Sequence, residues 1–139
     1  MLFRSVDEGT QALLNCGAEP VTLGLDKLAE RLAAYCKQTA RFAKSRAVID
    51  IGKDIPSMTA IHTNAHALAR YAALSQTAQI VPIVEPEVLM DGDHDIDRCY
   101  EVTTRVLNKV FQELRVQRDR KSTRLNSSHR SLSRMPSSA

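Results

Sequence analysis

The sequence predicts an α/β fold with parallel strands, and three observations carry that prediction. Residues 41–52 and 80–88 contain β-branched and other apolar residues and are bounded by turn residues, which is typical of strands. Residues 24–38, 58–77 and 95–117 repeat apolar residues at spacings of three and four, the period of an amphipathic helix. Strand and helix segments alternate along the chain, which favours parallel strands joined by right-handed crossovers.

The first part of the chain gives the weakest signals. Residues 1–23 are expected to be irregular, because Gly9, Gly17 and Pro20 interrupt a weakly apolar stretch. A helix is expected over residues 24–38, and a strand over residues 41–52 that ends at a glycine. The first predicted helix and the first predicted strand therefore lie in this part of the chain.

The second part is more regular. Pro56 suits the first turn of a helix over residues 58–77, where its missing N–H is not needed. The nearly continuous apolar run 80–84 indicates a strand covered on both faces. A final helix is expected over residues 95–117, with Asp93 or Asp95 near its positive end.

Length and composition limit the possible classes of protein. The 139 residues suit one domain, but they fall well short of the roughly 250 residues of a closed eight-stranded α/β barrel. No stretch approaches the ~20 apolar residues of a membrane span, and no signal peptide is apparent. Three widely spaced cysteines suit reduced thiols. We expect a cytoplasmic protein with no membrane partner.

The positive charge is concentrated at one end. The net charge is +3, but residues 118–139 hold six basic residues against one acidic residue, so the rest of the chain is mildly acidic. Basic proteins suit nucleic acid, and this body is not basic. We expect no nucleic-acid partner for the body of the chain.

Four charged residues form the candidate site. Side chains two apart in a strand share a face, so Lys44 pairs with Arg46 and Glu85 with Glu87. Neighbouring parallel strands would line one cavity with all four. Cations suit phosphate groups, and a lysine beside a carboxylate suits proton transfer near a carbonyl. A purely structural ion-pair network is the open alternative.

Other motifs are weaker. His62 and His66 are spaced like zincin ligands, but Thr63 replaces the glutamate of that motif, so a solvated helix face is the better interpretation. The acidic turn Asp91–Asp95 lacks the glycine and glutamate of a calcium loop. No nucleotide-binding loop or serine-hydrolase motif occurs. We expect no metal site.

Several segments together resemble one known family. They are Phe42-Ala-Lys44-Ser-Arg46, Asn64-Ala-x-x-Leu68-Ala-Arg70-Tyr71, Val84-Glu85-Pro-Glu87 and Asp91-Gly-Asp-His-Asp95. Between about residues 6 and 117 the chain is similar to the class I fructose-1,6-bisphosphate aldolases. The resemblance implies an incomplete (β/α)8 barrel segment of two to three β/α units. It also implies a metal-free, cofactor-free lyase acting on a phosphorylated sugar, and a homo-oligomeric parent enzyme.

The resemblance also implies roles for single residues. Lys44 would position and polarise the substrate, and Arg46 would hold the phosphate at the glyceraldehyde end. Glu85 would act as acid and base in dehydration of the carbinolamine, and Glu87 would support the neighbouring charges. Asp7 matches a family position close to the same cavity.

Departures from the family pattern are equally informative. Ser45 stands where the family usually has tryptophan, and Ser5 where it has a further phosphate-binding lysine. The segment with the Schiff-base lysine, of the Leu-Lys-Pro-Asn type, has no counterpart in this sequence. As a nucleophile is required for covalent catalysis, this chain is expected to be inactive as written.

The ends differ in composition from the middle. Residues 118–139 are rich in serine and arginine and are expected to be disordered. They and residues 1–5 are interpreted as non-native sequence around an aldolase-like segment at 6–117, with a natural basic tail as the alternative. Two other functions stay open: a small βαβα module that binds a phosphorylated ligand without turnover, and a tail that binds RNA or a membrane surface.

Overall fold

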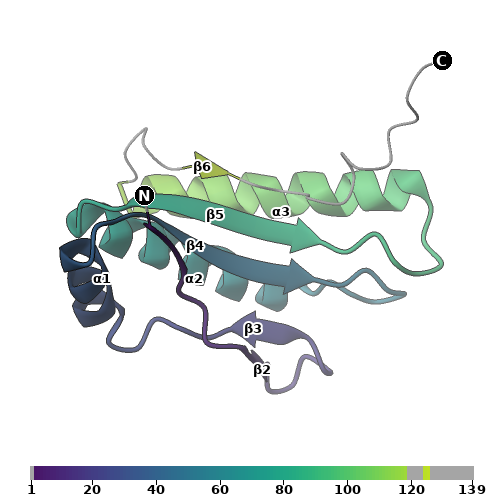
Figure 1. The fold of residues 1–139 in the computed structure, drawn as a ribbon. Coiled ribbons are helices and arrows are strands. Elements are labelled where there is room, and N and C mark those ends of the chain that lie inside the picture. Colours follow the sequence, from purple (N-terminus) through teal and green to yellow (C-terminus); the bar gives the residue numbers. More distant parts are fainter. Residues whose placement is uncertain (1, 119–123, 126–139) are drawn as a thin grey trace, which may run out of the picture.

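The computed structural model describes residues 2–118 and 124–125 of the chain. Strands and helices alternate as the sequence predicts (Figure 1). In chain order they are β1 (Leu2–Ser5), β2 (Thr10–Ala12), β3 (Pro20–Thr22), α1 (Leu28–Lys37), β4 (Ala40–Ile49), α2 (Met58–Thr77), β5 (Val81–Val88), α3 (Ile96–Val116) and β6 (Arg124–Leu125). The chain therefore forms three successive strand–helix units of an α/β fold, the upper end of the predicted range.

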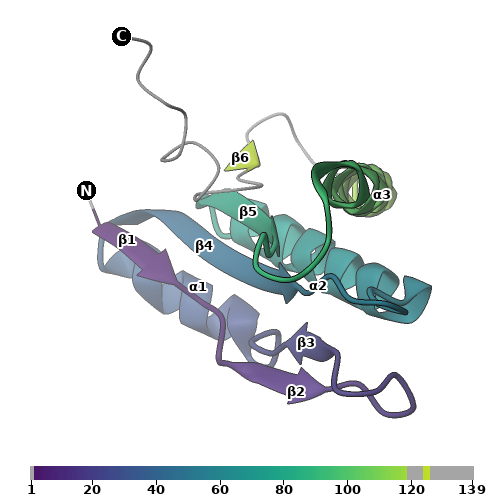
Figure 2. The ribbon, with the colours of Figure 1, turned by 90° about the vertical axis from the view of Figure 1, so that its right-hand side faces the viewer.

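One parallel sheet organises these units. Its strand order is β1-β4-β5-β6, and each neighbouring pair is parallel. The short strands β2 and β3 form a separate antiparallel hairpin, which lies beyond the carboxyl end of β1 (Figure 2). The helices pack against one face of the sheet. The charged residues lie on the other face and at the carboxyl ends of the strands.

Alternation along β4 separates these two faces. Ala43, Ala47 and Ile49 are buried and belong to the hydrophobic core. That core also takes Leu68 from α2 and Val84 from β5. Lys44 and Arg46 have the opposite parity and are only partly covered, which agrees with the two-residue period of a strand.

Residues 1–23 are not irregular, contrary to the sequence prediction. The described part of this stretch contains β1 and the β2–β3 hairpin. These strands have only three or four residues, too few for a recognisable alternation, and Asn15 and Gly17 take positive φ angles between β2 and β3. Pairing with β4, rather than local sequence, defines β1.

The first helix is shorter than residues 24–38, because its predicted start is not helical. Gly24 has a φ of +129° and Lys27 a φ of +51°, both outside the helical region. A Cβ atom on Gly24 would lie 2.7 Å from the carbonyl oxygen of Val6. Only glycine fits this close approach, so α1 begins at Leu28.

The other two helices match their predicted ranges closely, although Pro56 precedes the N-cap Ser57 and does not lie in the first turn of α2. Helix α2 spans Met58–Thr77, and Ser57 Oγ accepts a hydrogen bond from the N–H of Ala60 at 3.0 Å. Helix α3 spans Ile96–Val116, and Asp95 Oδ1 accepts one from the N–H of Arg98 at 2.8 Å. Of the two candidates at this end, Asp95 is therefore the N-cap.

The predicted terminal segments are only partly described. Leu2–Ser5 form β1 in the sheet. Of the predicted tail, Arg118 and the two-residue strand β6 are described, and β6 pairs with β5. The remainder of the tail lies outside the described residues, so its predicted disorder and the proposed non-native origin of both ends stay predictions.

Candidate active site at the carboxyl ends of the strands

The register of β4 on β5 brings the predicted charged residues together. Arg46 lies beside Glu85, and Val48 beside Glu87, in parallel register. Since side chains two apart share a face, the two cations and the two carboxylates all lie on the face of the sheet that the helices leave open. The structure therefore places all four predicted residues in one cluster.

Lys44 and Glu85 form the first pair. Lys44 Nζ lies 2.6 Å from Glu85 Oε2, and the Glu85 side chain is only 2% exposed. A buried carboxylate is costly unless a cation or hydrogen-bond donors accompany it. Lys44 therefore stabilises the charge that Glu85 carries into the sheet.

Arg46 and Glu87 form the second pair. Arg46 Nε donates to Glu87 Oε2. This hydrogen bond raises the pKa of Arg46, against the opposing effect of burial, and the negative charges of Glu87, Glu85 and Asp7 act in the same direction as the bond. The guanidinium stays half exposed, so it keeps donors available to a ligand.

Asp7 joins the cluster from the loop after β1. Its Oδ2 accepts hydrogen bonds from the backbone N–H of Arg46 at 3.3 Å and from Ser5 Oγ at 3.2 Å. All five predicted site residues thus gather at the carboxyl ends of the strands. One of these hydrogen bonds joins Asp7 to the backbone of Arg46, a geometry that the sequence could not specify.

A hollow opens next to the second pair. It has a volume of about 170 Å³, less than the roughly 300–1,000 Å³ typical of pockets for whole ligands. It is lined by Asp7, Gly9, Thr10, Thr22, Arg46 and Val48. Its size suits one end of a ligand, such as a single phosphate group.

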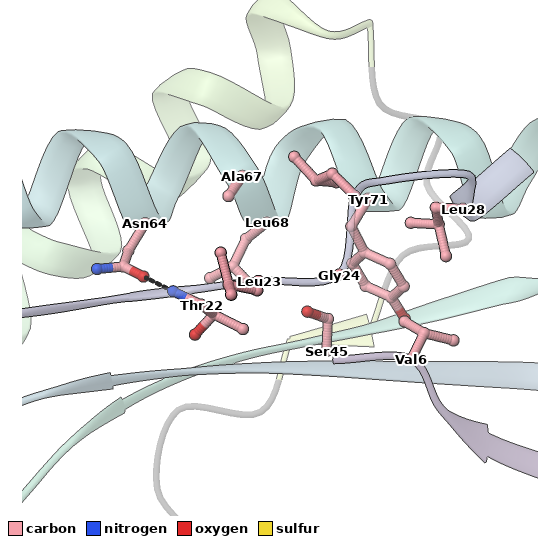
Figure 3. Close-up of a pocket in the computed structure, with 11 residues that line it drawn as sticks. Val6, Thr22, Leu23, Gly24, Leu28, Ser45, Asn64, Ala67, Leu68 and Tyr71 are labelled. Carbon is pink, nitrogen blue, oxygen red and sulfur yellow. Dashed lines mark hydrogen bonds between the residues drawn. The ribbon is translucent and has the colours of Figure 1, made fainter. Parts of the chain in front are cut away.

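Sequence reasoning missed Thr22 and Asn64 as part of this region. Thr22 Oγ1 donates to the carbonyl of Arg46 at 2.8 Å, and the N–H of Thr22 donates to Asn64 Oδ1 at 3.2 Å (Figure 3). In the sequence, Asn64 belongs to a motif of the family that the chain resembles, and an amide among the alanines of a predicted buried helix face is the one local signal, because a buried amide needs hydrogen-bond partners.

A second hollow, between α2 and the sheet, is a packing contact and not a binding site. It is drawn in Figure 3, where Tyr71, Leu68 and Ser45 converge, and its volume is only about 10 Å³. Such a space is about the size of one water molecule. Ser45 lies on this side of β4, so the substitution at this position leaves Lys44 and Arg46 on the opposite face.

The two histidines of α2 do not simply face solvent. His66 Nδ1 lies 3.1 Å, and His62 Nδ1 3.5 Å, from the carboxylate of Glu113 on α3. Lys109 Nζ lies 3.1 Å from the same carboxylate. The histidine rings remain about half exposed, so the helix-face prediction is right about their location and missed their partner.

No metal site is found in the part of the chain that the structure describes, where no group of three or more His, Cys, Asp or Glu side chains is arranged to hold an ion. Asp91–Asp95 form the turn before α3, with Asp95 as its cap. The three cysteines are free thiols. Among the described residues, no helix combines the length and apolar character that a bilayer crossing needs.

The cluster pairs a buried acid with a lysine and a second acid with an arginine, next to a small open hollow. This arrangement can exchange protons with a bound carbonyl or hydroxyl and can hold an anionic group. The cluster lies at the carboxyl ends of parallel strands, where α/β barrels build their active sites, and is therefore a candidate active site of an enzyme of that class.

Comparison with known proteins agrees with this class. The family model described as fructose-bisphosphate aldolase class-I (Glycolytic) matches residues 4–119. The chain therefore belongs to the class I fructose-bisphosphate aldolase family. Over 109 residues, 78% of the chain, it is 61% identical to the probable fructose-bisphosphate aldolase class 1 of Xanthomonas campestris and 52% identical to fructose-bisphosphate aldolase B of Gallus gallus.

A solved structure supports the same fold. Fructose-bisphosphate aldolase from Plasmodium falciparum, in complex with TRAP and a small-molecule inhibitor, superposes with a TM-score of 0.88 at 42% identity. The match covers 90% of this chain but 37% of that one, and the chain spans 33% of the Xanthomonas protein. The predicted fold class, an incomplete barrel segment, is confirmed.

Proposed function

We propose that this chain is a segment of an enzyme that cleaves fructose 1,6-bisphosphate into dihydroxyacetone phosphate and glyceraldehyde 3-phosphate through a lysine Schiff base. Family membership and the pairing of Lys44 with buried Glu85 at 2.6 Å support this proposal. The parent enzyme would be cytoplasmic, homo-oligomeric and part of glycolysis. Relatives named as cytosolic aldolases support that location.

Glu85 is proposed as the acid and base of the dehydration step. It would donate a proton to the carbinolamine hydroxyl, which leaves as water while the lysine nitrogen forms the iminium. Burial of Glu85 keeps competing water away from the carboxylate. Lys44, next to it, would polarise the substrate hydroxyls and stabilise the carboxylate once the proton has left.

Arg46 is proposed as the phosphate-binding residue and Glu87 as its support. Arg46 has five N–H donors in a fixed fork, and Glu87 engages one of them at Nε, so the remaining donors can bind phosphate. The hollow beside Arg46 supports this role because of its small size. The same hollow favours the second candidate function, a module that binds a phosphorylated ligand without turnover.

The chain as written is proposed to be inactive, because no lysine in it stands in a segment that resembles the family's Schiff-base strand. Borohydride reduction in the presence of dihydroxyacetone phosphate, followed by mass spectrometry, tests this proposal. We expect no covalent adduct. An adduct on Lys44 or any other lysine would contradict it.

Residues 1–5 and 118–139 are proposed to be non-native sequence around the aldolase segment. The serine- and arginine-rich composition of the second stretch supports this proposal. Sequencing the source transcript or locus across Gln117 decides between this origin and a natural basic tail. Contiguous coding of both parts at the locus would support the natural tail.

A further inference from the structure

At Arg46, strand β4 extends beyond the end of the neighbouring strand β1. Strand β1 ends at Ser5, beside Lys44, and the last backbone contact on that side is the N–H of Val6 to the carbonyl of Lys44 at 2.9 Å. Strand β4 continues to Ile49. Backbone groups two residues apart point to the same side of a strand, so Arg46 faces this side, where no strand of the described part of the chain pairs with it.

Two side chains replace the missing strand at Arg46. Asp7 Oδ2 accepts from its N–H at 3.3 Å, and Thr22 Oγ1 donates to its carbonyl at 2.8 Å. Every backbone N–H and C=O seeks a hydrogen-bond partner. These two hydrogen bonds therefore satisfy both groups and fix the backbone from which the Arg46 side chain extends to Glu87.

Thr22 is itself held in place from α2. The side chain of Asn64 is buried, and its Oδ1 accepts from the N–H of Thr22 at 3.2 Å (Figure 3). Its Nδ2 donates to the carbonyls of Pro20 at 2.9 Å and Ala60 at 3.1 Å. Glu19 Oε1 accepts from the N–H of Ser57 at 2.8 Å. The β2–β3 hairpin is thus tied to the first turns of α2, and through Thr22 to Arg46.

We propose that Thr22 is a positioning residue, which holds Arg46 from its backbone so that the guanidinium stays on Glu87 at the edge of the 170 Å³ hollow. The β2–β3 hairpin then lines the end of the site that is proposed to bind phosphate. This relevance to substrate rests on the proposed function, whereas the positioning itself does not.

The test measures hydrogen exchange of the Arg46 Nε–H by NMR in the full 139-residue chain. Thr22→Val removes the hydroxyl at nearly constant shape, and it is expected to speed this exchange roughly fivefold, the effect of losing one hydrogen bond. Thr22→Ser keeps a hydroxyl and is expected to restore slow exchange. Thr10→Val, on the same hairpin and lining the same hollow, is the matched control and is expected to leave the exchange rate of the Arg46 Nε–H unchanged.

The exchange rates of core amides, such as those of Leu68 and Val84, distinguish a loss of positioning at Arg46 from a loss of stability of the whole fold. If Thr22→Val leaves Arg46 exchange unchanged, or speeds the core amides to the same extent, the proposal is wrong. In the unsubstituted chain, the Thr22 hydroxyl proton is expected to exchange slowly and to show a scalar coupling to the Arg46 carbonyl carbon. Absence of that coupling overturns the proposal even where the valine variant fails to fold.

A separate titration with inorganic phosphate distinguishes the proposed function from this inference. Shifts of the Arg46 side-chain signals on addition of phosphate would support Arg46 as the phosphate-binding residue. Unshifted signals would count against that role, while the exchange measurements would still decide whether Thr22 positions Arg46.

Discussion

At the scale of single residues, each cation of the candidate site has a carboxylate of its own. Lys44 pairs with Glu85 and Arg46 with Glu87. Strand alternation and the βαβ repeat were enough to predict that these four would meet, because both are regular. The hydrogen bonds of Asp7 and Thr22 to the Arg46 backbone were not predictable, since they depend on where β1 stops.

A second residue-scale feature is the carboxylate of Glu113 between α2 and α3. Burial would raise its pKa, but hydrogen bonds from His66 and Lys109, with the charges of Lys109 and His62, outweigh burial and lower it. A carboxyl group with a lowered pKa in the folded state stabilises the fold above its unfolded pKa. That stability is lost as the pH falls through the folded pKa.

Replacing this carboxylate tests its contribution. We expect Glu113→Gln to lower the free energy of unfolding by roughly 1 kcal/mol at pH 7, and by less at pH 3, because this stabilisation is lost as the pH falls through the lowered pKa of Glu113. Urea unfolding at both pH values measures this. Glu101→Gln, on the exposed side of the same helix, is the control and should change little. An equal loss at both pH values would contradict the assignment.

At the scale of elements, the long and periodic segments were predicted and the short ones were not. Helices α2 and α3 show clear periods and begin after the capping residues Ser57 and Asp95, so the sequence locates them within a residue or two. Strand β1 and the hairpin are short and depend on β4 and α2 for their hydrogen bonds. Local sequence does not encode such contacts.

The cap of α3 provides an element-scale prediction. Asp95→Ala removes the acceptor for the N–H of Arg98 and should cost about 1 kcal/mol of unfolding free energy. Asp95→Asn keeps an acceptor and should cost much less. Asp93→Ala, in the same turn, is the matched control. Thermal unfolding measures all three, and a larger loss for Asp93→Ala would show that the wrong aspartate has been assigned as the cap.

At the scale of the whole molecule, the chain supplies three β/α units and about a third of the length of its relatives. The units bring the ion pairs Lys44–Glu85 and Arg46–Glu87 to one edge of the sheet, and the proposed lysine nucleophile has no counterpart in the sequence. We therefore propose that residues 6–117 carry a working part of an aldolase active site.

The most direct test transfers this segment into a complete relative. Residues 6–117 would replace the corresponding segment of the Xanthomonas campestris protein, and cleavage of fructose 1,6-bisphosphate would be assayed. We predict an active chimera, in which Glu85→Gln lowers kcat by about 100-fold or more, while the unfused chain shows no cleavage. A folded chimera without activity, or one in which Glu85→Gln leaves kcat unchanged, would contradict the claim.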